Sequence, residues 1–245
     1  MKNVIIYNKV PTAKFGGQKN DDVIKYYLET QIDNSIFYGW DINDIIIATN
    51  FDFEYKGIKN IKLNDVCEFS GYNNKWYGLR ELYNNHFNED CWIHDYDNWQ
   101  ISVIDKFPNF TGKIGGCTYV YNNEWNTASM FIKKDSHNIL DYVYEFLLQN
   151  KHIPFDSDEN AISYIRNVNE VKSYFSDLNQ KYNVGLTQLE KRYESAEKPV
   201  CVLGCKIFSN NEYEKFKFKY GNLDLIPGHL IDMIENRKIE IERLL

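Results

Sequence analysis

The segment CWIHDYDNWQ, residues 91–100, changes from an apolar run to a pair of acids. A short apolar run bounded by polar residues is typical of a buried β-strand. The two acids, Asp95 and Asp97, are separated by one residue, so at the end of a strand their carboxylates can converge on one hard cation. Mg²⁺ and Mn²⁺ prefer oxygen ligands, and they take the remaining ones from phosphates and water. We therefore predict that Asp95 and Asp97 bind Mg²⁺ or Mn²⁺.

The residues before this segment alternate between strand-like and helix-like patterns. Apolar runs predict strands over 3–10, 44–50 and 58–66, and helical spacing of apolar residues predicts helices over 21–40 and 73–87. This alternation is typical of a parallel sheet that is covered by helices on both faces. In such sheets ligands bind beyond the carboxyl ends of the strands. The strand ends at 8–9, 49–50 and 94–97 therefore form the expected binding edge.

The second half of the chain is less regular than the first. It predicts strands over 117–121, 128–132 and 198–208, and helices over 136–150, 159–168 and 228–245. No internal repeat and no Pro-, Gly- or Ser-rich linker interrupts the chain. We therefore predict an α/β fold with a Rossmann-like, mostly parallel sheet flanked by helices. It would form a single compact domain over 1–245, with residues 1–100 and 101–245 as its two halves.

The composition argues against several classes of protein. The formal net charge is −7, from 28 Lys and Arg against 35 Asp and Glu, whereas a protein that binds nucleic acid through phosphates usually has a basic face. No apolar run approaches the roughly 20 residues of a membrane-spanning helix. The five cysteines are scattered, which is typical of reduced thiols. We therefore expect a cytoplasmic protein without a membrane span.

Four segments together resemble one enzyme family. HDYDNWQ, after an apolar strand, resembles the D-x-D motif of the GT-A fold glycosyltransferases, which use nucleotide-sugar donors. Three later segments follow in the order seen in the retaining, glycogenin- and galactosyltransferase-like group. They are NTASMFI (126–132), similar to the N-[AS]-G-V-hydrophobic strand beneath the donor sugar, DSDENAI (156–162), similar to the D-Q-D-x-L turn, and DLNQKYNVG (177–185), similar to the L-P-x-x-[YW]-N segment. The resemblance covers about residues 3–207.

This resemblance implies a metal-dependent glycosyltransferase with the GT-A fold. It would transfer a sugar from a nucleoside-diphosphate sugar, above all a UDP-sugar, to a hydroxyl of a glycan or protein acceptor. Asp95 and Asp97 would hold Mn²⁺ or Mg²⁺ on the diphosphate in the nucleotide-binding first half. In the acceptor-side second half, Asn126, Asp158 and Glu159 would hold or polarise the sugar and the acceptor hydroxyl. A retaining reaction needs no dedicated base, whereas an inverting one makes Asp158 or Glu159 the base.

The sequence departs from the family pattern at three places. Ala128 or Ser129 stands where the family has a glycine, and Glu159 stands in place of the glutamine of D-Q-D. The family's third metal ligand, a histidine in a C-terminal strand, has no counterpart, because Val202 falls at about that position. His229 is the only histidine near the C-terminus, and it is the candidate for a third metal ligand.

Polar residues near the strand ends are candidates for donor binding. Neither a GxGxxG nor a GxxxxGK[ST] phosphate loop occurs, so a metal or basic side chains would hold a nucleotide. A diphosphate leaving group needs cationic stabilisation, which Lys75 and Arg80 would supply. An ordinary solvated lysine is the alternative for Lys75. Asn8 and Lys9, at the end of the first strand, are placed to contact a uracil or other base, and Tyr96 lies between the two acids.

Two other functions also fit the sequence. The abundance of Asn, Ile, Lys, Tyr and Phe suggests an AT-rich genome such as that of a virus or phage; the acceptor would then be a modified DNA base, and the location the host cytoplasm. Three tryptophans would stack on a flipped nucleotide beside a basic strip. They are Trp76, Trp99 and Trp125, and the strip is Lys113, Lys133 and Lys134. The other alternative is a nucleotide-sugar-binding module without turnover.

Overall fold

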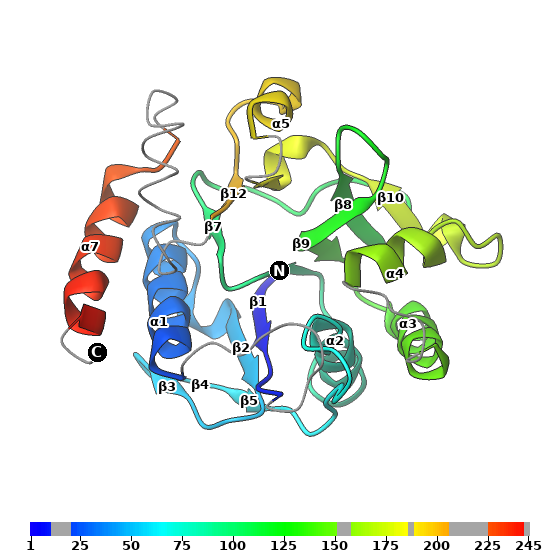
Figure 1. Ribbon diagram of the computed structural model, residues 1–245, viewed down its shortest axis with the longest axis horizontal. Helices are drawn as coiled ribbons and strands as arrows, with labels where there is room; N and C mark the ends of the chain where they lie inside the picture. Colours follow the sequence, from blue (N-terminus) through cyan, green and yellow to red (C-terminus); the bar gives the residue numbers. More distant parts are fainter. Residues whose placement is uncertain (11–20, 151–157, 186–188, 206–224, 243–245) are drawn as a thin grey trace.

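The computed structural model describes residues 1–10, 21–150, 158–185, 189–205 and 225–242 (Figure 1). Its helices are α1 (Asp21–Phe37), α2 (Asn74–Asn85), α3 (His137–Gln149), α4 (Asp158–Ile165), α5 (Leu189–Ser195) and α7 (Gly228–Glu242), with 3-10 turns at Ile42–Asp44, Lys172–Tyr174 and Gln180–Tyr182. Its strands are β1 (Lys2–Tyr7), β2 (Ile45–Thr49), β3 (Glu54–Tyr55), β4 (Ile58–Lys59), β5 (Ile61–Lys62), β6 (Cys91–His94), β7 (Asn98–Gln100), β8 (Ile114–Thr118), β9 (Trp125–Ile132), β10 (Phe175–Asp177), β11 (Val184–Gly185) and β12 (Val202–Gly204).

A seven-stranded sheet in the order β10-β8-β9-β6-β1-β2-β5 forms the centre of the molecule. β1 pairs in parallel with β2 and with β6, so Ile5 lies between Ile47 and His94. The pairs β2–β5 and β8–β10 are also parallel. β9 runs antiparallel to both of its neighbours, β6 and β8. The mostly parallel α/β sheet that the sequence predicts is therefore confirmed.

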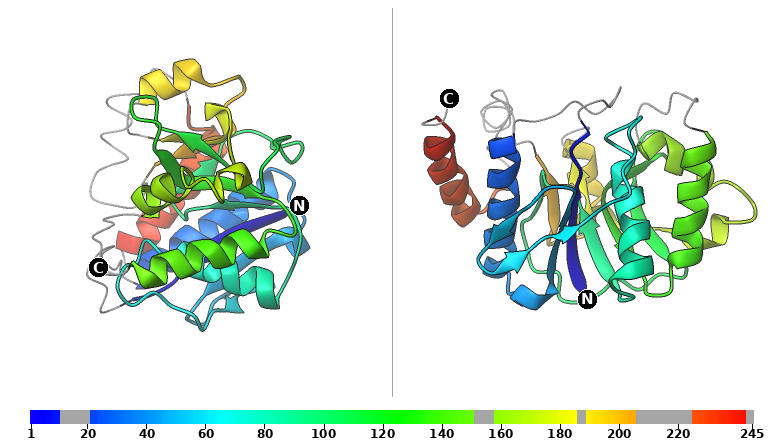
Figure 2. Two further views of the ribbon diagram at one scale, coloured as in Figure 1. Left: turned by 90° about the vertical axis from the view of Figure 1, so that its right-hand side faces the viewer. Right: turned by 90° about the horizontal axis from the view of Figure 1, so that it is seen from below.

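Successive residues of the central strands pack on opposite faces of this sheet, as the alternation of side chains along a strand requires. Val4 and Ile6 of β1 belong to the core cluster that contains α2, α3 and α4. Ile5 belongs to the cluster that contains Ile24 and Leu28 of α1. Figure 2 shows the strands between α1 with α7 on one side and α2 with α3 on the other. Both faces are therefore covered.

A second sheet of three strands, β11-β12-β7, receives the chain directly after β6. β6 ends at His94 in the large sheet, and β7 begins at Asn98 and pairs antiparallel with β12. The chain therefore crosses from one sheet to the other within Asp95–Asp97, which we name the acidic turn. The sequence predicts that the chain leaves the sheet here, and the structure confirms it.

The strand expected over 117–121 is displaced towards the N-terminus and runs from Ile114 to Thr118 instead. The glycines at its start are typical of a loop, but here they allow close packing. A Cβ on Gly116 would lie 2.9 Å from the indole ring of Trp125, so only a residue without a side chain permits this approach of β8 and β9. β3, β10, β11 and α5 also have no counterpart in the sequence-based expectations, and the strand expected over 58–66 is divided into β4 and β5.

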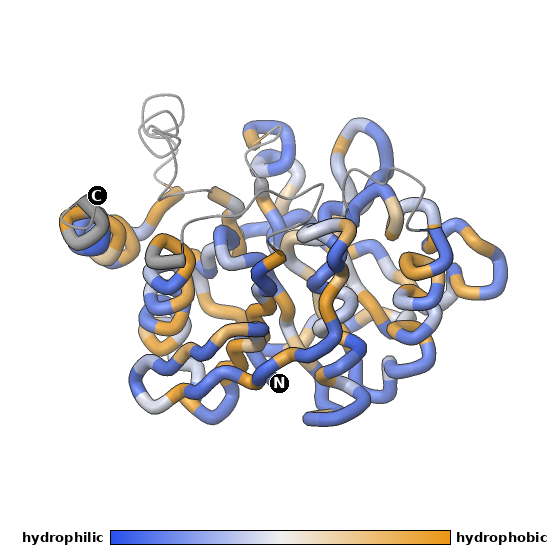
Figure 3. The backbone as a smooth tube through the Cα atoms, turned by 60° about the horizontal axis from the view of Figure 1, so that its bottom comes forward, coloured by the Kyte–Doolittle hydropathy of each residue, from blue (hydrophilic) through white to orange (hydrophobic). Residues whose placement is uncertain are grey.

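The distribution of apolar residues agrees with this layered arrangement. Hydrophobic stretches recur along the strands and helices inside the molecule, and the outer turns are mostly hydrophilic (Figure 3). The five cysteines are buried and carry free thiols. Within the described ranges, every helix is too short or too polar to cross a membrane.

Candidate functional site

The acidic turn is held to both sheets by backbone hydrogen bonds. The N–H of Asp95 donates to the carbonyl of Ala128 on β9 (2.8 Å), and the N–H of Asn98 donates to the carbonyl of Asp95 (3.0 Å). At the other end, the N–H of Cys205 donates to the carbonyl of Asp97 (2.9 Å). The Asp95 side chain keeps 32% of its surface exposed. The turn therefore presents a carboxylate at the carboxyl edge of the large sheet.

Lys75, in the first turn of α2, reaches the acidic turn from the side. Its Nζ lies 2.8 Å from Asp95 Oδ1 and 3.5 Å from Asp158 Oδ2, and it donates to the carbonyl of Thr127 at 2.8 Å. Burial alone would lower the pKa of Lys75, but Asp158 and Asp95 outweigh burial and raise this pKa above its usual value. The side chain is 8% exposed, so Lys75 is a buried ammonium between two carboxylates and not a solvated lysine.

Asp158 joins three elements at the start of α4. Its Oδ2 accepts a hydrogen bond from Thr127 Oγ1 (2.6 Å) and one from Trp76 Nε1 (3.3 Å), in addition to the contact with Lys75. These donors come from β9 and α2, and they converge on one carboxylate oxygen. The sequence does not single out Thr127. Its place inside the motif that begins at Asn126 is the signal that could have indicated a role in the site.

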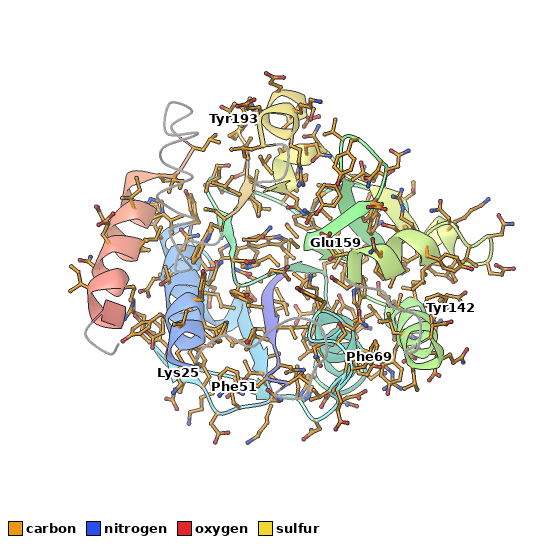
Figure 4. The ribbon with its side chains drawn as sticks, viewed as in Figure 1. Lys25, Phe51, Phe69, Tyr142, Glu159 and Tyr193 are labelled. Carbon is orange, nitrogen blue, oxygen red and sulfur yellow. The ribbon has the colours of Figure 1, made fainter. Side chains whose placement is uncertain are left out.

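Glu159 is joined to Asn126 through Tyr119, which follows β8. The Tyr119 hydroxyl lies 3.0 Å from each Glu159 carboxylate oxygen, and Asn126 Nδ2 donates to this hydroxyl at 3.1 Å. The amide oxygen of Asn126 accepts from the N–H of Ala128 at 3.0 Å. Figure 4 labels Glu159 on α4 beside β9. The structure therefore brings together Asn126 and Glu159, as predicted, through a tyrosine that no sequence motif indicated.

Two carboxyl groups of this site titrate well above their ordinary range. Partial burial raises the pKa of Asp95 above its usual value; Lys75 opposes this rise, and Asp97 adds to it. Burial also raises the pKa of Glu159 to about 7, with a further contribution from Asp158. Strongly shifted pKa values of neighbouring groups at a sheet edge are typical of functional sites.

The acidic turn provides oxygen ligands of the kind that Mg²⁺ and Mn²⁺ prefer. The charge of Asp97 raises the pKa of Asp95, so the two carboxylates repel each other, and a divalent cation between them would relieve this repulsion. Among the described residues, no group of three or more His, Cys, Asp and Glu side chains is arranged to hold a metal ion. The donor set therefore fits an ion that takes its remaining ligands from a diphosphate and water.

His229 lies at the opposite edge of the sheet from the acidic turn. Its ring stacks on Phe37, with 3.5 Å between ring centroids, and its Nε2 is 3.2 Å from Asn34 Oδ1. Because α1 connects two parallel strands, it runs back across the sheet, and Phe37 at its end lies by the amino ends of the strands. The structure therefore does not bring His229 to Asp95 as a third metal ligand.

Arg80 also points away from the acidic turn. Its Nε donates to Asp141 Oδ1 of α3 at 2.8 Å, and its guanidinium carbon lies 4.2 Å from the centroid of the Tyr144 ring. Arg80 follows Lys75 by five positions, which corresponds to about 140° around a helix. The two cations that the sequence predicts for donor binding therefore lie on different sides of α2, and only Lys75 reaches the acidic turn.

Asn8 and Lys9 follow β1 at the same edge as the acidic turn. Asn8 is 7% exposed, and within the described part of the chain neither the nitrogen nor the oxygen of its amide has a hydrogen-bond partner. The backbone N–H and carbonyl of Lys9 pair with the side-chain amide of Asn50, each at 2.8 Å. Lys9 Nζ lies 4.5 Å from the centroid of the Phe51 ring. Asn8 is thus a buried amide that offers both a donor and an acceptor.

The aromatic residues singled out in the sequence are packed inside the protein. Tyr96, within the acidic turn, meets Tyr7 and Tyr27 edge-on, with ring centroids 5.4 and 5.0 Å apart. The three tryptophans expected to stack on a flipped base are fully buried. They are Trp76, Trp99 and Trp125, each 0% exposed. The expectation that they stack on a nucleotide is therefore wrong, because they fill the core.

Comparisons with known proteins identify the fold. No family model and no curated protein matches this sequence. Among solved structures, the galactosyltransferase LgtC in complex with donor and acceptor sugar analogs matches with a TM-score of 0.60 and 13% identity, over 95% of this chain and 100% of LgtC. The glycosyltransferase GlyE of Streptococcus pneumoniae TIGR4 matches with a TM-score of 0.59 and 9% identity, over 96% of this chain and 63% of GlyE. A glycosyltransferase involved in the glycosylation of the major capsid of PBCV-1 matches with a TM-score of 0.55 and 9% identity, over 89% of this chain and 98% of that one.

These likenesses show that the chain has the GT-A fold seen in glycosyltransferases. The resemblance found in the sequence motifs is therefore confirmed at the level of the fold. The acidic turn, β9 and the start of α4 converge at the edge of the sheet where this class of fold binds its ligands.

Proposed function

We propose that this chain is a metal-dependent glycosyltransferase that transfers a sugar from a UDP-sugar to a hydroxyl of a glycan or protein acceptor. The observation that carries the proposal is the convergence of Asp95, Lys75 and Asp158 at the carboxyl edge of a GT-A sheet. These groups come from the acidic turn, α2 and α4, and no local sequence pattern alone would place them together. A buried charged cluster of this kind is costly to maintain unless it serves binding or chemistry.

The acidic turn would bind the donor diphosphate through a divalent cation. Asp95 and Asp97 would hold Mn²⁺ or Mg²⁺, which supplies neutralisation of the negative charge that develops on the leaving diphosphate. Lys75 orients Asp95 by its contact with Oδ1 at 2.8 Å, so the position of this carboxylate is fixed before the donor arrives. Lys75 thus acts on the diphosphate through Asp95, rather than as the direct phosphate contact that the sequence suggested.

The amide of Asn8, which has no hydrogen-bond partner among the described residues, supports a uracil-containing donor. A buried polar group without a partner costs about 1–3 kcal/mol, and a ligand that supplies the partner recovers this free energy. The carboxamide of Asn8 presents one acceptor and one donor, and the imide edge of uracil offers the complementary N–H and carbonyl. We therefore assign Asn8 to base recognition, at the end of β1 next to the acidic turn.

Asp158, Glu159 and Asn126 would face the sugar and the acceptor. Cleavage of the anomeric bond develops positive charge on the sugar. The carboxylate of Asp158 would stabilise this charge through Oδ1, since the three hydrogen bonds described above all end on Oδ2. Glu159, with a pKa of about 7, is suited to accept a proton from the acceptor hydroxyl near neutral pH. Asn126 would donate a hydrogen bond from its second Nδ2 hydrogen to a sugar hydroxyl, because its amide oxygen already accepts from Ala128 and Asn183.

The proposal is tested by hydrolysis of UDP-sugars in the presence of Mn²⁺. D95N and D97N should each lower the rate by about 100-fold or more, because each removes a metal ligand while keeping the size of the side chain. The matched control is D52N, since Asp52 is 92% exposed and pairs only on the surface with Lys62. Unchanged hydrolysis in both D95N and D97N would overturn the assignment, as would tight UDP-sugar binding without any turnover, which would indicate a binding module.

A further inference from the structure

Arg192 of α5 is a fully buried cation outside the groups discussed so far. Its contacts are with amide and carbonyl oxygens and with an aromatic ring, and Nη1 has no hydrogen-bond partner among the described residues. Burial lowers the pKa of Arg192 from its usual value. Removing a guanidinium from water costs several kcal/mol, so a packing role alone would favour an apolar residue here.

One branch of contacts leads from Arg192 to Glu159. The guanidinium carbon lies 5.1 Å from the centroid of the Tyr119 ring, within the range of a cation–π interaction. The hydroxyl of the same tyrosine bonds both carboxylate oxygens of Glu159 and accepts from Asn126 Nδ2. The position of the Tyr119 ring therefore determines where the Glu159 carboxylate lies.

A second branch leads from Arg192 to the other end of the Asn126 amide. Nη2 of Arg192 donates to the carbonyl of Asn183, and Nε donates to Gln180 Oε1 at 3.2 Å. Asn183 Nδ2 in turn donates to Asn126 Oδ1 at 2.9 Å and to the Asn126 carbonyl at 3.1 Å. The two branches thus hold the nitrogen and the oxygen of one amide from opposite sides.

The backbone leaves room for this arrangement at Gly185. A Cβ on Gly185 would lie 2.8 Å from Arg192 Nη1 and 3.6 Å from Asn126 Nδ2. Two N–H groups therefore border the space that a side chain at Gly185 would fill, and a Cβ there would press against the guanidinium of Arg192. This close approach ties β11 and α5 to the start of β9.

We propose that Arg192 is a positioning residue of the site, which fixes the orientation of the Asn126 amide and of the Glu159 carboxylate through Tyr119 and Asn183. This proposal rests on the function proposed above, because the orientation of the Asn126 amide and the Glu159 carboxylate affects the rate only if these groups act on the sugar or the acceptor. A displacement of about 1 Å in a reacting group lowers a rate by about 100-fold. The nucleotide of the donor is instead assigned to the acidic turn and Asn8, and neither is among the described contacts of Arg192.

The first test needs no donor. The side-chain amide resonances of Asn126 are assigned by their loss in N126D, and they are then recorded in R192M, R192K and K191M. Lys191 is an exposed residue of the same helix, so K191M is the matched control. R192M should shift the Asn126 amide pair and increase its exchange with water about tenfold, R192K should do so less, and K191M should leave it unchanged. An unchanged Asn126 pair in a folded R192M or R192K would overturn the proposal, even if the protein transfers no sugar.

The second test separates positioning from donor binding. In UDP-sugar hydrolysis, R192M should lower kcat by about 100-fold and change the donor KM by less than about twofold. Y119F breaks the same chain of contacts but keeps the ring, so Y119F with R192M should be little worse than R192M alone. The proposal would be overturned if the loss in kcat of the double variant equalled the product of the losses in Y119F and R192M. A rise in KM with unchanged kcat in R192M would also overturn it. If R192M does not fold, the same comparison is made with R192K, Y119F and their double variant.

Discussion

Lys75 is the cation that makes the acidic site compatible with a folded protein. It is buried between Asp95 and Asp158, and both carboxylates raise its pKa. Removal of one partner from such a cluster leaves uncompensated charge in a poorly solvated place. The same ammonium holds the Thr127 carbonyl, so stability and geometry of the site depend on one side chain.

We predict that K75M lowers the free energy of unfolding by about 3 kcal/mol, because the buried Asp158 and the partly buried Asp95 lose their counter-ion while the volume of the side chain is kept. Urea unfolding at neutral pH measures this loss. The control is K62M, since Lys62 is 60% exposed in its pair with Asp52 and should change stability by less than about 1 kcal/mol. Equal effects of K75M and K62M would contradict the prediction.

Glu159 gives a prediction about pH. Its pKa is raised from the ordinary value of 4.5 to about 7 in the folded protein, mainly by burial. The folded state therefore binds this proton more tightly than the unfolded state, so the contribution of Glu159 to stability is greatest below pH 4.5, falls as the pH rises to about 7 and is constant above it.

E159Q removes this titration and keeps an acceptor for the Tyr119 hydroxyl. The urea midpoint of E159Q relative to the natural protein should therefore rise between about pH 5 and about pH 8. N160Q, a change at the exposed neighbouring residue, should show no such trend. A midpoint difference that is flat or falls across this range would contradict the raised pKa.

At the level of single residues, the sequence predicts what lies close together along the chain and misses what only the fold brings together. Asp95, Asn126, Asp158 and Glu159 lie in short motifs, and the structure gathers them at one edge of the sheet. Arg192 lies in no such motif, because its contact with the ring of Tyr119 depends on the fold. The same reason explains why His229, chosen as the only C-terminal histidine, lies far from the acidic turn.

At the level of elements, the antiparallel strand β9 explains how distant motifs meet. A strand that runs against β6 begins where β6 ends, so Asn126 and Thr127 lie beside the acidic turn. The period-two and helical patterns of the sequence predict most strands and helices close to their observed places. They do not predict that β7 pairs with β12, because this pairing joins residues about a hundred positions apart.

The tight contact of β8 with β9 gives a prediction for this element. G116V should lower the free energy of unfolding by about 1–3 kcal/mol, because the new side chain would overlap the ring of Trp125. Trp125 Nε1 donates to Asp177 Oδ1 at 2.7 Å, so the displacement should also change the tryptophan fluorescence. In G228A, where a Cβ meets nothing within 4 Å, stability should be unchanged or slightly higher. A neutral G116V would contradict this account.

At the level of the whole molecule, the binding edge collects residues from β1, α2, the acidic turn, β9 and α4. A ligand that contacts several of these elements should stabilise the fold as one unit. The two carboxylates of the turn supply few metal ligands, so the cation and the diphosphate are expected to bind together.

We therefore predict that UDP and Mn²⁺ together raise the thermal midpoint more than the sum of their separate effects. At a concentration about 100 times the dissociation constant, binding to the folded state adds about 2.7 kcal/mol. D97N should abolish the joint effect, and D52N should keep it. N8A should weaken UDP more than inorganic diphosphate, because Asn8 is assigned to the base. Additive shifts in the natural protein would contradict the joint binding.

The acidic turn is anchored on two different bodies. Asp95 is tied to Ala128 in the large sheet, and Asp97 is tied to Cys205 next to β12 in the small one. The distance between the carboxylates of Asp95 and Asp97 therefore depends on how the two sheets pack against each other. Substitutions in the packing between the sheets, remote from any acidic residue, are therefore expected to change the affinity of the proposed cation site by changing the distance between its two carboxylates.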